Sequence, residues 1–361
     1  MQTEGDTKMS ETAMDEKFMH RCIQLAKNGL GTTAPNPMVG AVLTHKNRII
    51  GEGYTSPFGG AHAEVNAIAS IKEPQLLPKA TLYVTLEPCS HFGKTPPCAD
   101  LIIKNKIQRV VIGLLDPHQK VAGKGIQKLK DAGCDVRVGV LEKECKEHHK
   151  RFLMFHNKKR PYIILKWAET ADGFIAPEKL VRNTEPEPYW ITGSLSKQLV
   201  HKWRSEEQAI LVGTATVLED NPKLDVRLWT GKSPTRIVLD TRLRIPQNYH
   251  VLNKKQRTII FTRVTDTTKY IEGIEYVYLN EPNNNAEAIC SALYRLNIQS
   301  LIIEGGAKTL QSFIDASLWD ESRIFKGLSL FKEGIRSPRV KGSPIHSKNI
   351  ETDHLTILKN D

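Results

Sequence analysis

Residues 85–98 read Thr-Leu-Glu-Pro-Cys-Ser-His-Phe-Gly-Lys-Thr-Pro-Pro-Cys, and with Ala61-His-Ala-Glu64 upstream they decide the fold of the first half of the chain. Helices are expected to begin at His62 and near Cys98, and a strand is expected to end just before Cys89. A histidine and two thiolates give zinc three ligands and leave its fourth position open, which distinguishes a catalytic site from a structural one. The sequence therefore predicts a catalytic zinc site formed by His62, Cys89 and Cys98.

Glu64 lies two residues after His62 and is expected to move protons rather than to bind the metal. A zinc-bound water becomes acidic near neutral pH, and Glu64 would pass its proton to the ring nitrogen and the leaving amine. Zinc deaminases divide these roles in the same way, with a His-x-Glu and a Pro-Cys-x-x-Cys signature. Eight residues instead of two separate Cys89 from Cys98 here. The first half is therefore predicted to be a hydrolytic deaminase acting on an amino-substituted, base-like ring.

The spacer between the two cysteines carries further candidates. Thr95 is expected to cap the helix at Cys98, so that the positive end of the helix dipole stabilises the Cys98 thiolate. His91 and Lys94 are candidate substrate contacts, and exposed loop positions are an equally good interpretation of both.

Length, charge and cysteine content bound the remaining possibilities. The 361 residues favour two domains, and the formal charge of +11 favours an anionic partner. Since the basic residues are spread along the chain, a small phosphorylated molecule is expected in preference to nucleic acid, and no membrane contact is expected. No apolar leader and no run of about 20 apolar residues occurs, so the cytoplasm is the expected location. The four cysteines outside the motif are interpreted as structural: Cys22, Cys134, Cys145 and Cys290.

Strand and helix patterns alternate along both halves of the chain. A helix ending near Gly29 is followed by a hairpin over 38–54 and by alternating helices and strands up to residue 140. This order predicts a mixed three-layer α/β domain. A charged helix over 141–155 then leads to His156-Asn-Lys-Lys-Arg-Pro161, where the domain boundary is placed. The second half is also expected to be α/β, with strands over 162–167, 209–213, 235–240, 257–262 and 300–304.

With these motifs in view, the chain resembles the bifunctional deaminase–reductase family of riboflavin biosynthesis. The long cysteine spacer ending in Thr-Pro-Pro-Cys is its most specific feature, because short-spaced nucleoside and nucleic-acid deaminases lack it. Further matching stretches are Pro35-Asn-Pro-Met-Val-Gly40, Asp116-Pro-His-Gln-Lys-Val-Ala-Gly-Lys-Gly125, Leu165-Lys-Trp-Ala-Glu-Thr-Ala-Asp-Gly173, Trp190-Ile-Thr192, 213–227 and Glu304-Gly-Gly306.

The resemblance implies two domains and two consecutive reactions. Residues 1–13 would be a flexible extension, 14–157 a cytidine-deaminase-like three-layer α/β/α domain, and 158–361 a dihydrofolate-reductase-like α/β domain. The first would deaminate 2,5-diamino-6-(5-phosphoribosylamino)pyrimidin-4-one with zinc. The second would reduce the ribose of 5-amino-6-(5-phosphoribosylamino)uracil to ribityl with NADPH.

The residues of the second half are compatible with this implication. Glu304-Gly305-Gly306 follows an apolar strand and precedes a helix, which suits a phosphate cradle, although an ordinary strand-to-helix turn would look the same. Arg204 and Arg227 are fixed cations suited to a substrate phosphate. Lys166 and Glu304 are the expected proton-handling groups. Carried over from the family, the cofactor contacts are Glu169, Trp190, Thr216, Asp220, Thr241 and Gly306, and the substrate contacts are Arg204, Leu224, Arg227 and Glu304.

The chain departs from the family pattern at four places. The stretch between Gly173 and Trp190 is longer than usual, and Pro188 stands where the family has a substrate-binding serine. His118-Gln119 replaces Asn-Pro, and residues 325–334 lack the usual Pro-x-Leu-Leu-Gly. Three alternatives therefore stay open: a deaminase with a drifted reductase domain, a nucleoside or nucleic-acid deaminase, and a basic nucleic-acid-binding protein with a structural zinc. Oligomerisation with identical chains also stays open.

Overall fold

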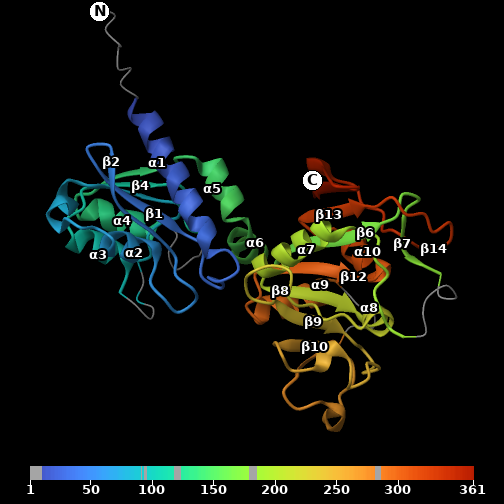
Figure 1. Cartoon of the computed structure of the whole chain (residues 1–361). Coiled ribbons are helices and arrows are strands. Elements are labelled where there is room, and N and C mark those ends of the chain that lie inside the picture. Colours follow the sequence, from blue (N-terminus) through green and yellow to red (C-terminus); the bar gives the residue numbers. More distant parts are fainter. Residues whose placement is uncertain (1–9, 91, 93–95, 118–122, 179–184, 281–285) are drawn as a thin grey trace, which may run out of the picture. The chain divides into compact units, whose positions relative to one another are not determined.

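The computed structural model describes residues 10–90, 92, 96–117, 123–178, 185–280 and 286–361. The chain divides into two compact units, Met1–Lys158 and Lys159–Asp361 (Figure 1). Each unit has its own apolar core. Among the described residues, no helix combines the length and the apolar character needed to cross a membrane.

A five-stranded sheet with the order β2-β1-β3-β4-β5 forms the centre of the first unit. The expected hairpin is confirmed, because β1 (Gly40–His45) pairs antiparallel with β2 (Arg48–Tyr54). β1 also pairs antiparallel with β3 (Thr81–Val84), whereas β3, β4 (Arg109–Ile112) and β5 (Asp135–Val138) run parallel. The carboxyl ends of β3 and β4 therefore lie at one edge of the sheet.

Helices cover both faces of this sheet, which confirms the predicted three-layer arrangement. α1 (Glu11–Ala26) and α5 (Glu142–His148) lie over one face, where a Cβ on Gly113 would meet Cys145 of α5 and Met19 of α1. On the other face, α2 (Ala63–Ala69) packs on β1 and β2, and α3 (Cys98–Lys104) packs between α2 and α4 (Lys124–Asp131). Short 3-10 turns span Lys27–Gly29 and Pro74–Lys79.

Two expectations for helix bounds in this unit were wrong. The Ser10 hydroxyl accepts a hydrogen bond from the Ala13 N–H, so α1 already begins at Glu11, inside the expected extension. The charged helix expected over 141–155 is two helices, α5 and α6 (Lys150–Lys158), because His149 leaves helical geometry with a ψ of 11°.

A nine-stranded mixed sheet with the order β11-β10-β9-β8-β12-β6-β13-β16-β15 forms the second unit. All five expected strands are present, and their continuous apolar runs match their burial between helical layers. They are β6 (Tyr162–Glu169), β8 (Ala209–Gly213), β9 (Thr235–Leu239), β10 (Thr258–Thr262) and β12 (Ser300–Gly305). Wherever two of these five strands pair with each other, they run parallel, so the carboxyl ends of all five lie at one edge of the sheet.

The other elements complete the second unit. α9 (Ala286–Arg295) and α10 (Ala307–Asp315) pack on one face of the sheet, and the Trp203 ring of α7 (Ser194–Glu206) packs on Phe325. α8 (Thr214–Asp220) follows β8 directly, and the part of this unit that the structure describes includes 3-10 turns at His250–Leu252 and Thr267–Lys269. Six strands were not predicted: β7 (Phe174–Pro177), β11 (Glu275–Tyr278), β13 (Glu321–Lys326), β14 (Gly334–Arg336), β15 (Ser343–Ile350) and β16 (Asp353–Lys359).

Candidate functional sites

The structure brings the three predicted zinc ligands together. His62 is the N-cap residue of α2, Cys98 is the first residue of α3, and Cys89 follows the end of β3. The Nδ1 atom of His62 lies 3.4 Å from the Cys98 Sγ and 3.7 Å from the Cys89 Sγ. All three ligand atoms lie within 4.8 Å of one another.

The three groups of this cluster shift one another's pKa values. Hydrogen bonding from Cys98 lowers the pKa of the Cys89 thiol to about 4. The same interaction, with burial, raises the pKa of Cys98 far above its ordinary value. Hydrogen bonding with Cys89 raises the pKa of His62. One nitrogen and two sulfurs that lie within 4.8 Å of one another are a donor set that fits zinc.

Glu64 lies in the first turn of α2, two residues after the metal ligand His62. Its side chain is only 4% exposed, and burial, followed by the nearby Cys89 charge, raises its pKa to about 7. A carboxyl group with this pKa can both accept and release a proton near neutral pH.

The predicted helix cap at Thr95 and the predicted contacts of His91 and Lys94 lie outside the described residues, as does the His118-Gln119 departure. Pro97, rather than Thr95, is the N-cap residue of α3, and it makes no side-chain cap hydrogen bond. The Cys98 backbone N–H instead donates to the Cys89 Sγ at 3.3 Å. This contact stabilises the Cys89 thiolate directly.

In the second unit, Glu304 near the carboxyl end of β12 is surrounded by cations. The Arg204 guanidinium from α7 donates to both carboxylate oxygens at 2.8 Å, and the Lys166 Nζ from β6 lies 3.5 Å away. Burial alone would raise the pKa of Glu304, but Arg204 and Lys166 lower it to about 2. Burial also lowers the pKa of Lys166. Glu304 is therefore a fixed anion that orients both cations.

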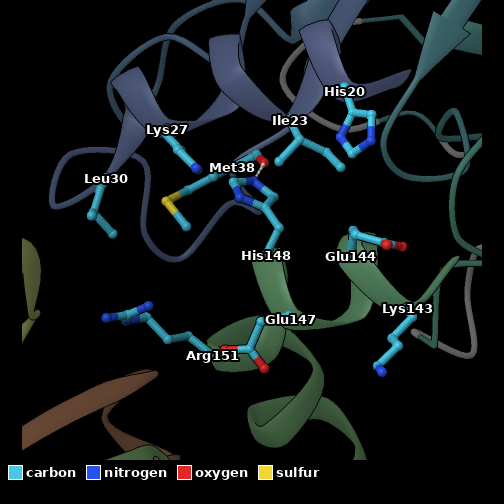
Figure 2. A pocket seen from close by; sticks show the side chains of 10 residues that line it. All are labelled: His20, Ile23, Lys27, Leu30, Met38, Lys143, Glu144, Glu147, His148 and Arg151. Atoms are coloured by element: carbon cyan, nitrogen blue, oxygen red, sulfur yellow. Dashed lines mark hydrogen bonds between the residues drawn. The ribbon is translucent and has the colours of Figure 1, made fainter. Parts of the chain in front are cut away.

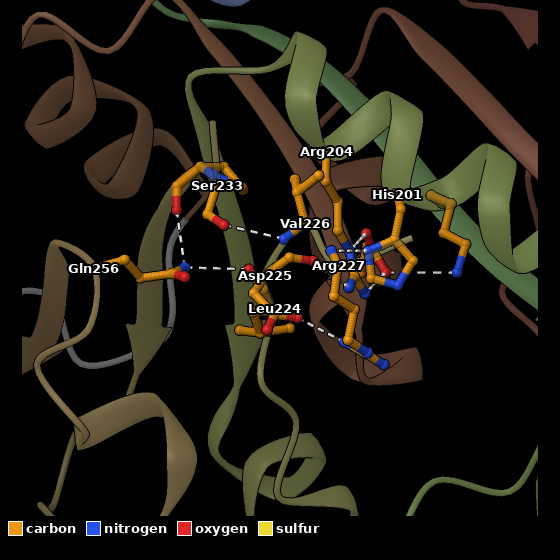
Figure 3. A network of polar contacts seen from close by, with 11 residues as sticks. His201, Arg204, Leu224, Asp225, Val226, Arg227, Ser233 and Gln256 are labelled. Atoms are coloured by element: carbon orange, nitrogen blue, oxygen red, sulfur yellow. Dashed lines mark hydrogen bonds and ion pairs between the residues drawn. The ribbon is translucent and has the colours of Figure 1, made fainter. Parts of the chain in front are cut away.

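Figure 3 shows a polar network that extends from Arg204 to the loop after α8. Arg204 donates to the Asp225 backbone oxygen, and Arg227 forms an ion pair with the Asp225 carboxylate at 2.6 Å. The His201 Nδ1 accepts the Arg227 backbone N–H at 3.3 Å. Burial and the charges of Arg204 and Arg227 lower the pKa of His201 to about 4, so its imidazole is neutral.

His201 and Asp225 were not identified from the sequence. A signal was available for His201, because it lies three residues before Arg204 and so shares its helix face. Leu224, a predicted substrate contact, is buried, has a φ of 52° and accepts a hydrogen bond from the Gln256 side chain through its backbone oxygen. This hydrogen bond fixes the part of the loop that directly precedes Arg227.

Thr216 and Gly306, two of the predicted cofactor contacts, lie together. Gly306 has a φ of 82° and is the N-cap residue of α10. A Cβ on it would lie 3.3 Å from the Thr216 Oγ1, and one on Gly305 would lie 2.7 Å from the Thr216 Cγ2. The glycines thus allow the β12–α10 turn to approach the first turn of α8. Such a turn leaves backbone N–H groups available to a phosphate.

Two of the remaining predicted cofactor contacts, Thr241 and Glu169, lie at the carboxyl ends of parallel strands. Thr241 follows β9, and Asp220 is the last residue of α8. Glu169 ends β6 and accepts a hydrogen bond from the Trp167 indole at 3.0 Å. The exposed Trp190 ring lies 3.9 Å from the Lys197 Nζ, and Pro188 is half-buried in the same loop. Because ligands of parallel α/β sheets bind at this edge, the arrangement is compatible with a cofactor site.

A separate cavity of the first unit, of about 620 Å³, lies between α1 and α5 (Figure 2). In it, the Nε2 of His148 lies 2.7 Å from the Met38 backbone oxygen. The three metal ligands are not among the residues that line it, so it does not mark the metal centre. Its lining residues are His20, Ile23, Lys27, Leu30, Met38, Lys143, Glu144, Glu147, His148 and Arg151.

Two family models match the two units. Residues 12–114 match the cytidine and deoxycytidylate deaminase zinc-binding region, and residues 161–327 match the RibD C-terminal domain. These matches confirm the predicted deaminase and reductase fold types and agree with the predicted zinc and NADPH requirements.

Relatives and solved structures span both units. The riboflavin biosynthesis protein RibD of Aquifex aeolicus is 41% identical over 90% of this chain and 92% of its own length. RibD of Escherichia coli is 34% identical over 86% of this chain and 87% of its own. The crystal structure of a diaminohydroxyphosphoribosylaminopyrimidine deaminase/5-amino-6-(5-phosphoribosylamino)uracil reductase from Thermotoga maritima is 37% identical. The structural match covers 98% of this chain and 100% of the Thermotoga maritima chain, with a TM-score of 0.88.

Because similarity of this extent includes the second unit, an enzyme with deaminase activity alone is not favoured, and neither is a nucleic-acid-binding protein. The resemblance seen in the sequence is confirmed. The chain belongs to the RibD family of bifunctional deaminase–reductases of riboflavin biosynthesis.

Proposed function

We propose that the first unit deaminates 2,5-diamino-6-(5-phosphoribosylamino)pyrimidin-4-one and that the second unit reduces 5-amino-6-(5-phosphoribosylamino)uracil. The convergence of His62, Cys89 and Cys98 beside the buried Glu64 is the observation that carries the proposal. The activities printed for the Thermotoga maritima structure support it. The partner is a small phosphorylated pyrimidine, for which the formal charge of +11 is favourable.

In the deaminase centre, His62, Cys89 and Cys98 would hold zinc and leave one position open. Zinc bound in this way lowers the pKa of a water molecule at that position. Glu64 accepts the proton that the attacking water loses. It passes this proton to the ring nitrogen, then takes the second proton of the same oxygen as the carbonyl forms and passes it to the amine, which leaves as ammonia. The pKa of about 7 for Glu64 suits both directions of transfer.

In the reductase centre, NADPH supplies the hydride when it is bound. Lys166 provides the proton that the sugar oxygen receives, and Glu304 orients Lys166 and Arg204. Arg227, which is partly exposed, is suited to the substrate phosphate. Thr216 and Gly306 would contact the cofactor phosphate, with Glu169, Trp190, Asp220 and Thr241 as further cofactor contacts, and Leu224 would complete the substrate site.

The cytoplasm is proposed as the location. All six cysteines are free thiols, and two of them serve the metal site, which is compatible with a reducing compartment.

The change Glu64→Gln tests the deaminase assignment. Gln keeps the shape of the side chain but cannot carry the proton, so ammonia release is expected to fall by about 10²–10⁴-fold. Zinc content, measured by elemental analysis, should stay at one ion per chain, because Glu64 is not a ligand. Turnover close to that of the wild type would contradict the assignment.

Arg227→Ala provides the reciprocal control in the same chain. It should lower NADPH oxidation with the deaminated phosphate as substrate and leave ammonia release intact. Loss of both activities in either variant would indicate general unfolding rather than the proposed roles.

A further inference from the structure

Glu87 is a buried carboxylate, two residues before Cys89, whose oxygens accept only backbone N–H groups among the interactions described. Glu87 is only 4% exposed. Oε1 accepts from Gly125 at 2.9 Å and from Ile126 at 3.2 Å, and Oε2 accepts from Gly123 at 3.0 Å and from Asp116 at 3.3 Å. Four donors offset the cost of burying this charge.

The donors come from two separate stretches of the chain. Gly125 and Ile126 belong to the first turn of α4, where the helix dipole favours a negative charge, and Gly123 is its N-cap residue. Asp116 lies beyond the carboxyl end of β4. One side chain therefore fixes α4 and the end of the β4 segment to the same point.

The contact with α4 is close enough to need a glycine. A Cβ on Gly125 would lie 2.1 Å from the Pro88 carbonyl oxygen, which is too short for any side chain. The first turn of α4 is therefore packed directly on the residue that precedes the metal ligand Cys89.

Cys89 is in turn connected to α3. Its backbone oxygen accepts the Ala99 N–H at 3.1 Å, and its sulfur accepts the Cys98 N–H at 3.3 Å. A continuous set of contacts thus runs from α4 through Glu87 and Pro88 to Cys89 and α3, and the place of the Cys89 sulfur depends on where Glu87 is held.

From these contacts we propose that Glu87 is a positioning residue of the deaminase centre. Its carboxylate, bound to four backbone N–H groups, fixes the backbone that presents Cys89 and the two stretches that flank it. This rests on the proposed zinc-dependent function of the first unit. The role is distinct from that of Glu64, because Glu87 acts through the backbone and touches no reacting atom.

The test compares Glu87→Gln with Asp15→Asn in the full chain. Asp15 is a matched control because it is also a buried carboxylate of the first unit, with Tyr83, Arg109 and Arg137 as partners. Arg109 begins β4, so Asp15 lies toward the opposite end of that strand from the segment that Glu87 holds. Both variants are expected to lower the melting temperature of the first unit.

Only Glu87→Gln should weaken zinc binding, measured by competition with a chelator, by about 10–100-fold. Hydrogen exchange at Asp116, Gly123, Gly125 and Ile126 should also accelerate only in this variant. NADPH oxidation by the second unit should be unchanged, and a cooperative melting transition of the first unit shows that this unit is folded. Wild-type zinc affinity and exchange in Glu87→Gln, or equal losses in Asp15→Asn, would overturn the proposal.

Gly125→Ala tests the same contact if Glu87→Gln does not fold. The new Cβ pushes α4 away from Pro88 and leaves the carboxylate in place, so weaker zinc binding and faster exchange at Gly123 and Ile126 are expected. Unchanged values would also overturn the proposal. A wild-type protein that binds zinc but releases no ammonia would instead refute the proposed function and not this inference.

Discussion

Glu64 and Glu304 are both buried carboxylates, and their neighbours shift their pKa values in opposite directions. Burial and the nearby Cys89 charge raise the pKa of Glu64 to about 7, although His62 partly opposes the rise. Glu304 is also buried, but Arg204 and Lys166 lower its pKa to about 2. Groups whose environments separate their pKa values in this way take different chemical roles. Glu64 is suited to proton transfer, whereas Glu304 is suited to holding cations in place.

The low pKa of Glu304 leads to a prediction about acid stability. Folding lowers the pKa of this carboxyl group from its ordinary value of 4.5, so the group stabilises the folded protein when the pH is above 4.5. This contribution is lost as the pH falls toward about 2. The shift corresponds to roughly 3 kcal/mol. In Glu304→Gln, the free energy of unfolding of the second unit should therefore fall less steeply between pH 4.5 and 2 than in the wild type.

Tryptophan fluorescence can follow this unfolding selectively, because all five tryptophans lie in the second unit. Urea unfolding at a series of pH values gives the slopes to be compared. Parallel slopes for the two proteins would show that Glu304 titrates normally and would contradict the ion network.

At the level of single residues, the sequence predicted the metal centre more completely than the reductase centre. His62, Glu64, Cys89 and Cys98 occur in short motifs whose residue types already specify their chemistry. The network of Glu304 with Lys166 and Arg204 joins residues 138 and 100 positions apart. Local sequence patterns contain no information about such pairing, and for that reason Asp225 was missed, whereas His201 could have been found from its spacing to Arg204.

Among the elements, α7 connects the C-terminal strands to the reductase centre. It carries His201 and Arg204 on one face. Its N-terminal end is fixed by Asp353 of β16, whose carboxylate accepts the Gly193 N–H at 2.9 Å and the Ser196 hydroxyl at 2.6 Å. Asp353 is buried, and its bond with Ser196 is buried as well. The last strand of the chain therefore determines where α7 begins.

Asp353→Ala should consequently reduce both stability and reductase activity. The buried Ser196 hydroxyl is left without this acceptor, which costs about 1–3 kcal/mol, and the part-buried Gly193 N–H loses its acceptor as well. Displacement of α7 should lower kcat/KM for NADPH oxidation, while ammonia release stays unchanged. Asp266→Asn is the control, because Asp266 caps an exposed 3-10 turn of the same unit. Loss of stability without any change in reductase kcat/KM would show that α7 keeps its place without Asp353.

The missed elements have a common physical explanation. β15 is exposed along nearly its whole length and shows no apolar alternation, so its strand structure depends on pairing with β16. The break between α5 and α6 at His149 was missed because the charged pattern continues across it. There, the buried imidazole lies 3.1 Å from the Thr85 hydroxyl of the sheet. In both cases tertiary contacts override the local pattern.

At the scale of the whole molecule, the two cores share no residue. The first runs from Phe18 to Phe152 and the second from Ile163 to Trp319. The sheet of each unit is completed by strands of that unit alone. Each unit also has a size at which single domains commonly fold.

A fragment of residues 159–361 should therefore fold and oxidise NADPH when given the deaminated phosphate, even with zinc chelated. All of the proposed reductase groups, from Lys166 to Gly306, lie within it, and none of the metal ligands does. The full chain with Cys98→Ala should retain the same activity and lose ammonia release. Tryptophan fluorescence would establish that the fragment is folded. A folded fragment without NADPH oxidation would mean that the reductase depends on the first unit or that the departure at Pro188 has disabled its site. Pro188→Ser separates these explanations, because only a disabled site would regain activity when the hydroxyl is restored.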